Sequence, residues 1–308
     1  MTRPVALPST LTVIERGWLS SNNVLFDDGD CASIVDTGYG THALQTLQLV
    51  RAALAGKPLT RIVNTHLHSD HVGGNAALQA EYGASIIIPP GDAAAVARWD
   101  EEALSYAPTG QYCPRFRYDT LLEPDSFIEL GGLAWQVVAA PGHDPNMVML
   151  YNHDEGILLS ADALWENGFG AIFPEIEGES GFAEERSVLE WIDRVRPRVV
   201  IPGHGPPFVD VAGALDRALR RLGALEASPE RNARSIAKVM VKFWLLQVRS
   251  APIADLTRHV AGSRYLKLIN QRYFADQTEA AVIERAVAEL VAGGGAARHG
   301  DRIDNLDD

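Results

Sequence analysis

The chain has 308 residues, of which 46% are hydrophobic and 22% are charged, and its formal net charge is −13. This composition is typical of a soluble globular protein, and the length allows either one large domain or two domains of unequal size. The acidic charge argues against nucleic acid as a partner. No apolar run reaches the roughly 18 residues that span a bilayer, so we expect no membrane partner.

The amino terminus and the cysteines indicate the compartment. Residues 1–4 are not followed by the long apolar segment of a secretory signal. The two cysteines, Cys31 and Cys113, form neither a disulfide framework nor a metal-type spacing. We therefore expect a cytoplasmic protein in a reducing environment.

Up to about residue 90, short strands come first, and helices then alternate with strands. Apolar and β-branched runs between turn-forming residues predict strands at 11–14, 23–26, 31–35, 59–63 and 84–88. Apolar residues at helical spacing predict a helix at 41–55, which stops at Gly56 before Pro58. A second helix is expected at 75–82.

The middle of the chain repeats this pattern, and the last third is almost entirely helical. We expect strands at 127–130, 133–139, 147–151, 156–159 and 198–201, with a helix at 183–195. Helices are then predicted at 211–227, 229–248, 253–260, 264–274 and 278–292. The apolar cluster at 239–245 predicts that this helical region packs on the core or forms a homodimer contact. Residues 293–308 are rich in glycine, alanine and charge, and we expect them to be disordered.

Three histidines and an aspartate lie within six residues, directly after the strand predicted at 59–63. They are His66, His68, Asp70 and His71. Imidazoles and carboxylates are the ligands that divalent zinc, iron and manganese prefer. Because the chain has only nine histidines in all, three so close together indicate a metal site rather than a polar loop.

Three further residues of the same types each follow a predicted strand. His143 comes after 133–139, Asp162 after 156–159 and His204 after 198–201. A single histidine in such a place is more often structural than functional. Four elements in order, each at the end of a strand, favour a metal centre built from several loops.

The pattern His-x-His-x-Asp-His at 66–71, followed in order by the other three residues, resembles the signature of the metallo-β-lactamase superfamily. The resemblance covers about residues 10 to 210 and points to the branch of glyoxalase II, lactonases and endoribonuclease-like enzymes. It implies an α/β fold, the four-layer αββα sandwich, with a C-terminal helical extension. The expected division is a catalytic domain at 1–210, a helical region at 211–292 and a disordered tail at 293–308.

The resemblance also implies a ligand set for two divalent ions, expected to be zinc, with iron or manganese as alternatives. By analogy with the family, one ion is held by His66, His68 and His143, and the other by Asp70, His71 and His204. Asp162 bridges the two, and Asp70 is the family's usual proton shuttle. Asp36 and Asp144 are candidates to brace ligand histidines from outside, and Trp165 and Phe169 are candidates for the wall of the substrate pocket.

The implied activity is hydrolysis of a small or medium ester, lactone or thioester by a metal-bridging hydroxide. Asp162 stands where the β-lactamases of this fold carry cysteine or serine, which argues against antibiotic hydrolysis. The run 202–206 lacks the Cys-Gly-His-Glu-Tyr of glyoxalase II, which weakens a glutathione thioester as substrate. Two alternatives stay open. One is a nucleic-acid phosphodiesterase, since 213–290 has more basic than acidic residues, and the other is a mononuclear iron oxidoreductase like the sulfur dioxygenases.

Overall fold

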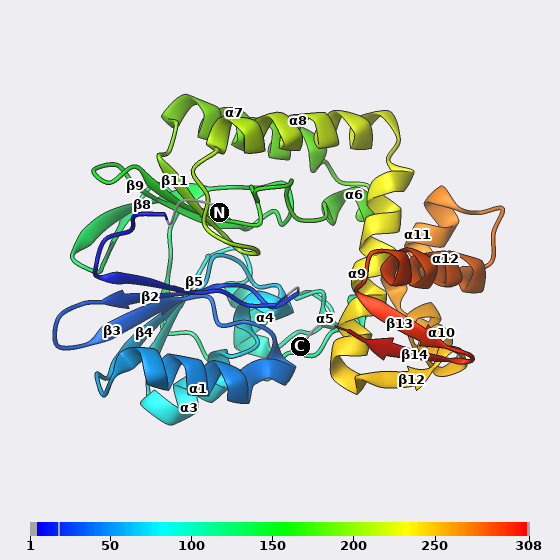
Figure 1. The fold of residues 1–308 in the computed structure, drawn as a ribbon, viewed down its shortest axis with the longest axis horizontal. Coiled ribbons are helices and arrows are strands. Elements are labelled where there is room, and N and C mark those ends of the chain that lie inside the picture. Colours follow the sequence, from blue (N-terminus) through cyan, green and yellow to red (C-terminus); the bar gives the residue numbers. More distant parts are fainter. Residues whose placement is uncertain (1–4, 18, 307–308) are drawn as a thin grey trace.

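Two β-sheets lie face to face at the centre of the computed structural model, which describes residues 5–17 and 19–306 (Figure 1). The first sheet has the strand order β1 (Leu11–Ile14), β2 (Asn23–Asp27), β3 (Ala32–Val35), β4 (Leu59–Val63), β5 (Ser85–Ile88) and β6 (Thr120–Leu121). The second has the order β11 (Val199–Pro202), β10 (Ile157–Ala161), β9 (Val148–Asn152), β8 (Leu133–Ala139) and β7 (Phe127–Leu130).

Helices cover the outer face of each sheet. In Figure 1, α1 (Ala43–Leu54) and α3 (Asn75–Tyr82) lie below the six-stranded sheet, while α7 (Phe182–Val195) and α8 (Val211–Ala227) lie above the five-stranded one. This arrangement confirms the expected αββα layers. The sequence did not predict the short helices in the connections, because one turn or two show no period. They are η1 (Gly40–His42), α2 (Ser69–Val72), α4 (Ala93–Arg98), α5 (Tyr106–Thr109) and α6 (Pro174–Glu177).

The core between the sheets fixes which strand ends come together. Phe26 packs edge-on against Trp135, with ring centroids 5.5 Å apart, and both side chains are fully buried. Strands β3 and β4 are parallel, as are β10 and β11. A backbone hydrogen bond of 2.7 Å from Asn22 N, directly before β2, to Gly203 O, directly after β11, joins the two sheets, and β2 begins beside the end of β3 because the two are antiparallel. The carboxyl ends of these four strands therefore meet at one edge of the sandwich.

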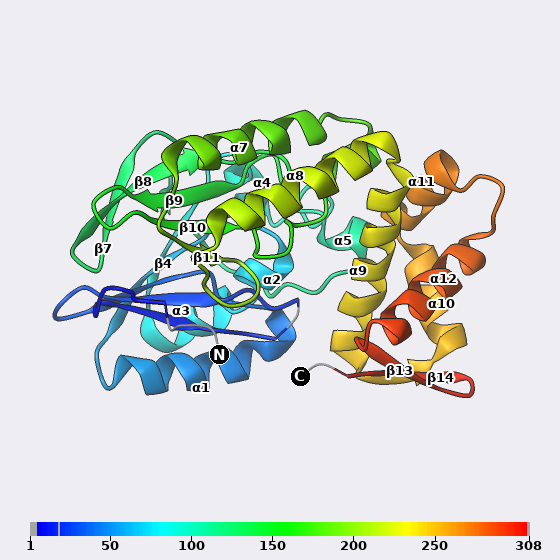
Figure 2. The same cartoon turned by 45° about the horizontal axis from the view of Figure 1, so that its top comes forward.

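The last third of the chain is helical, as expected, and has a core of its own. Helix α9 (Glu230–Val248) runs along one end of the sandwich, and α10 (Ile253–Gly262), α11 (Arg264–Tyr273) and α12 (Glu279–Ala292) lie beyond it (Figure 2). Ile236, Leu266 and Val287 are among its fully buried residues. Among the described residues, no helix is both long and apolar enough to cross a bilayer.

Helix α8 belongs with the sandwich rather than with the helices that follow it. Leu215 and Leu222 of α8 share a hydrophobic cluster with Leu189 of α7 and with the five-stranded sheet. The sequence placed the end of the first domain at residue 210, because it saw only the change to continuous helix. We propose instead that the boundary lies near Pro229, between α8 and α9.

The segment after α12 corrects one expectation. Residues 293–308 were expected to be disordered, but β13 (Ala296–His299) and β14 (Arg302–Asn305) form a hairpin that pairs with β12 (Ser250–Pro252). Ile303 is fully buried in the helical core. Composition alone does not predict this sheet, because β14 pairs with a strand about 50 residues earlier in the chain. Residues 307 and 308 of the predicted tail lie outside the described residues.

Helix α9 is tied to the sandwich by one buried amide, and its removal gives a first prediction. Asn232 accepts a hydrogen bond from Ile172 N at 3.1 Å and donates one to Ile172 O at 2.7 Å. In Asn232→Ala, a buried backbone N–H and C=O lose their partners, which costs about 1–3 kcal/mol each in an apolar setting. We expect the free energy of unfolding to fall by roughly 2 kcal/mol or more in urea titrations. Arg231→Ala, at an exposed neighbour, is the control, and equal stabilities of the two variants would contradict the anchoring role.

Candidate metal centre

All seven predicted ligands come together at the edge where β4, β8, β10 and β11 end. His66 and His68 lie in the loop after β4, and Asp70 and His71 lie in the single-turn helix α2 that follows. The other three come from the loops after β8, β10 and β11. Three overlapping groups each have potential ligand atoms within 4.8 Å of one another: His66, His68 and His143; His66, His71 and Asp162; and Asp70, His71 and His204.

The first group presents three ring nitrogens to one point. His68 Nδ1 lies 3.1 Å from His66 Nε2 and 2.7 Å from His143 Nε2. His143 Nδ1 is 2.5 Å from Ala171 O, so this nitrogen carries the hydrogen and leaves the Nε2 lone pair directed into the group. Three ring nitrogens that each offer a lone pair cannot form hydrogen bonds with one another. A bound cation would accept all three lone pairs.

The protonation of these histidines suits a cation as well. Burial lowers the pKa of His68 and of His143 to about 4. Burial, together with the neighbouring histidines, holds the pKa of His66 well below its usual value. Since metal ligands must be neutral imidazoles, these three side chains are in the binding form at neutral pH.

The group of Asp70, His71 and His204 combines two imidazoles with one carboxylate. His204 Nε2 lies 3.2 Å from Asp70 Oδ2, and His71 Nε2 lies 4.0 Å from the same oxygen. His71 is fully buried, and within the described residues its Nε2 makes no hydrogen bond of good geometry, although Asp162 Oδ1 lies 3.3 Å away. A buried polar atom without a partner is costly, and a cation between His71, His204 and Asp70 would remove that cost. The donor set therefore fits a divalent metal ion.

Asp162 lies between the group of His66, His68 and His143 and the group of Asp70, His71 and His204. Its Oδ2 lies 3.4 Å from His143 Nε2, and its Oδ1 lies 3.3 Å from His71 Nε2 and 3.6 Å from His204 Nε2. Burial acts to raise the pKa of this carboxyl, but His204, His71 and His143 outweigh it and hold the pKa well below the usual range. Each oxygen of an ionised carboxylate thus faces a different group of histidines.

Asp36 and Asp144 contact ligand histidines from outside, at their second ring nitrogen. Asp36 Oδ2 lies 2.7 Å from His71 Nδ1 and accepts a hydrogen bond from Thr65 Oγ1 at 2.7 Å, while Oδ1 accepts one from Thr65 N at 2.9 Å. Asp144 Oδ2 is 3.5 Å from His68 Nε2. Asp36 is thus at hydrogen-bond distance from His71, whereas Asp144 is further from His68, and the bracing role of both stays a prediction.

Two glycines allow the loops to approach the centre this closely. A Cβ on Gly203 would collide with Asp162 Oδ1, and a Cβ on Gly170 would collide with the ring of His143. The sequence did not indicate a role for Gly170, because nothing in it shows that the loop after β10 folds back against His143.

A pocket opens directly over the ligands. Trp165, one of the two predicted wall residues, lines it, and its Nε1 donates a 3.3 Å hydrogen bond to Asp162 Oδ1. Phe169, the other, is fully buried beneath the guanidinium of Arg221, which lies 4.5 Å from its ring centroid, and it lines the adjoining cavity instead. The prediction missed Phe173, whose ring centroid is 5.1 Å from that of His68.

Gln111 also lines this pocket. Helix α9 contributes two further lining residues, Val239 and Phe243. The apolar cluster at 239–245 was the sequence signal for these residues. It could not distinguish the helical core from the pocket wall, because α9 is apolar on more than one face.

Comparison with known proteins supports the geometry. The family model of the metallo-beta-lactamase superfamily matches residues 16–205. A hydroxyacylglutathione hydrolase of Anaeromyxobacter dehalogenans is 34% identical over 142 residues, 46% of this chain and 45% of that one. An acyl-coenzyme A thioesterase of Gallus gallus, MBLAC2, is 25% identical over 252 residues, 75% of this chain and 83% of that one. The chain thus spans less than half the length of the hydroxyacylglutathione hydrolases that it matches.

A solved structure shows the same fold along nearly the whole chain. The metallo-beta-lactamase family protein of Thermus thermophilus has a TM-score of 0.56 and 21% identity, and the match covers 97% of this chain and 100% of that one. The family model spans more than half of the chain and includes all seven residues gathered at the sheet edge. The chain therefore belongs to the metallo-beta-lactamase superfamily.

Proposed function

We propose that this protein is a metal-dependent hydrolase that cleaves carboxylic esters, lactones or thioesters at a centre of two divalent ions, expected to be zinc. The observation that carries the proposal is the position of Asp162, whose two oxygens face separate groups of histidines at 3.3 to 3.6 Å. A carboxylate so placed suits two neighbouring cations better than one. His66, His68 and His143 would hold the first ion, and Asp70, His71 and His204 the second.

Divalent ions bound there would supply Lewis acidity, which activates water at neutral pH and polarises the bond to be broken. Proton transfer and the exclusion of water are assigned to side chains around the centre. Asp70 lines the pocket, and its contacts with His204 and His71 both use Oδ2. We assign Oδ1 the transfer of a proton to the leaving group. Trp165 and Phe173 exclude water around the reacting carbonyl.

The relatives support a thioester or ester rather than a phosphodiester. Two of them are named a hydroxyacylglutathione hydrolase and an acyl-coenzyme A thioesterase. A second pocket beside His68 and His143 is lined by the carboxyl groups of Asp92, Asp144 and Glu177. Carboxylates around the centre disfavour a phosphodiester, whose negative charge lies at the bond to be cleaved, and the net charge of −13 also argues against nucleic acid.

Hydrolysis of a small panel tests the proposal. Zinc-loaded protein would be assayed with acyl thioesters, 4-nitrophenyl esters, lactones and bis(4-nitrophenyl) phosphate, before and after removal of metal with a chelator. We expect cleavage of the carboxylic substrates, loss of cleavage with the chelator and recovery on adding zinc. Cleavage of the phosphodiester alone would favour the nuclease alternative, and no cleavage of any carboxylic substrate by zinc-loaded protein would contradict the proposal.

A further inference from the structure

A large cavity adjoins the pocket over the metal centre, and no step of the proposed chemistry uses it. Its volume is about 420 Å³, within the range of roughly 300 to 1,000 Å³ that is usual for small-molecule sites. It lies between the loop at 165–171 and the helices α8, α9 and α12, which contribute Arg221, Val239 and Leu290 among other residues. We call this cavity the side chamber.

The side chamber and the pocket over the ligands share a wall. Leu19, Trp165, Ala171 and Val239 line both. The carbonyl oxygen of Ala171 also lies 2.5 Å from Nδ1 of His143. The chamber and the pocket are therefore adjacent, and a substrate whose carbonyl carbon is at the centre would reach the chamber by passing Trp165 and Val239.

The lining of the side chamber is mostly apolar, and its charged groups have partners. Lys238 Nζ lies 3.2 Å from Glu289 Oε2. Arg221 donates to the carbonyl oxygen of Phe169 and covers its ring. Apart from the Lys238–Glu289 ion pair and Arg221, much of the surface comes from apolar side chains such as Leu19, Phe169 and Leu290. Such a surface favours an aliphatic group over a charged or hydroxylated one.

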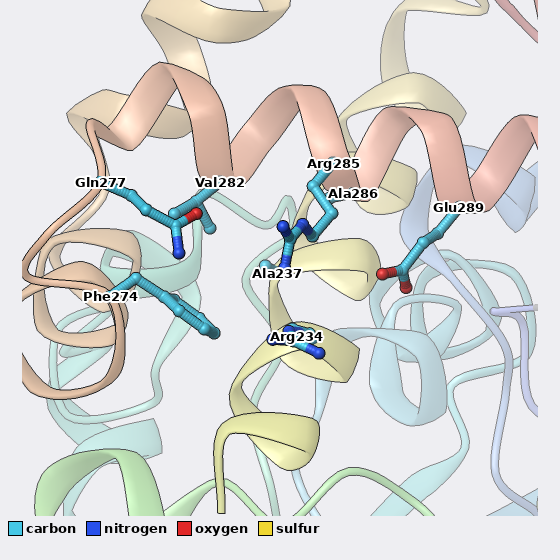
Figure 3. A pocket seen from close by; sticks show the side chains of 8 residues that line it. All are labelled: Arg234, Ala237, Phe274, Gln277, Val282, Arg285, Ala286 and Glu289. Atoms are coloured by element: carbon cyan, nitrogen blue, oxygen red, sulfur yellow. The ribbon is translucent and has the colours of Figure 1, made fainter.

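Two other cavities among the described residues suit an aliphatic chain less well. The pocket beside His68 has about 170 Å³ and is lined by carboxyl groups. A cavity between α9 and α12 is lined by Phe274, Val282, Arg234 and Glu289 among other residues (Figure 3). Its volume is about 10 Å³, which is room for at most one water molecule.

We propose that the side chamber holds the aliphatic acyl chain of the substrate, so that the enzyme prefers medium-chain acyl thioesters or esters to acetyl or hydroxyacyl ones. The inference rests on the proposed hydrolase function and names its substrate class. In the reaction one water is consumed: its oxygen bonds to the carbonyl carbon, the bond from that carbon to sulfur or oxygen breaks, and the leaving group takes a proton. The free acid then dissociates from the chamber.

A chain-length series tests the inference. The substrates are N-acetylcysteamine thioesters of saturated acids with 2 to 12 carbons, assayed with zinc-loaded protein. Each methylene group buried in the chamber should raise kcat/KM by about two- to fourfold until the chamber is full. A kcat/KM that does not change with chain length would overturn the inference while leaving the hydrolase function intact.

A matched pair of variants locates the effect. Ser235 lines the side chamber, and Ser235→Phe fills part of it, which should flatten the increase of kcat/KM with chain length. Arg231→Phe puts the same ring on α9 one turn earlier, at an exposed residue, and should keep the wild-type increase. The same flattening in both variants, or in neither, would contradict the assignment of the chamber.

Binding gives a readout that does not depend on turnover. Decanoate would be titrated calorimetrically into chelator-treated wild type and Ser235→Phe, with thermal unfolding as a check that the variant is folded. We expect wild type to bind decanoate at least about tenfold more tightly, because the phenylalanine ring occupies the space of several methylene groups. Equal affinities would overturn the inference. If no thioester is cleaved but this difference is found, the chamber is confirmed and the proposed reaction fails.

Discussion

Replacing Asp162 with alanine is expected to reduce hydrolysis by more than 100-fold and to weaken metal binding in both groups of histidines. Removing a mere outer partner of a metal ligand costs about 10- to 100-fold, and Asp162 is in contact with both groups at 3.3 to 3.6 Å. Without the carboxylate, two cations at this edge would face each other with no negative charge between them. Metal content by elemental analysis, measured beside kcat/KM, checks both parts of this expectation.

Asp154→Ala serves as the control for this experiment. Asp154 is an exposed turn residue between β9 and β10, so the substitution removes the same charge far from the centre. Wild-type metal content and activity are expected there. If Asp162→Ala stayed folded and kept the metal content and activity of wild type, Asp162 would not be a shared ligand.

Asp36→Asn is the second substitution with a large expected effect, although Asp36 is not one of the proposed ligands. Both of its oxygens accept hydrogen bonds: Thr65 donates at 2.9 and 2.7 Å, and His71 Nδ1 lies at 2.7 Å. In Asp36→Asn, an NH₂ group replaces one of the two oxygens and faces an N–H or O–H of Thr65 or His71. Two donors cannot form a hydrogen bond with each other. His71 would lose its orientation, and we expect metal affinity or kcat/KM to fall by about 10- to 100-fold.

The backbone at Asp36 decides the choice of substitution and control. Asp36 has a φ of 55°, a left-handed conformation that asparagine tolerates better than alanine does. Asp125 has a φ of 63° and is exposed in the turn before β7, so Asp125→Asn repeats the change in the same backbone conformation. Zinc affinity would be measured by competition with a chromophoric chelator. An unchanged affinity in Asp36→Asn would show that His71 needs no brace.

The residues that the sequence predicted best are those that follow a strand. Strands alternate with a period of two and end at turn residues, so β1 and β4 have the bounds that the pattern predicted. The prediction that His66, Asp162 and His204 meet at one edge came from the family resemblance, and in the structure the parallel pairs β3–β4 and β10–β11 end at that edge. Chemistry that depends on residue type and spacing along the chain is therefore readable from the sequence.

Contacts between distant segments were not readable in the same way. The sheet of β12, β13 and β14 depends on pairing across about 50 residues, which composition does not encode. Phe173 and Val239 reach the pocket only because the loop after β10 and helix α9 fold against the sandwich. Residues whose role depends on tertiary packing, including those of the side chamber, required the structure.

The metal content of the purified wild-type protein tests the central claim most directly. Elemental analysis after expression with added zinc should find about two ions per chain, one for each group of histidines on either side of Asp162. The two should be removed together by a chelator, because the groups share that carboxylate. A single ion per chain at saturating zinc, with full hydrolytic activity, would contradict the two-metal centre.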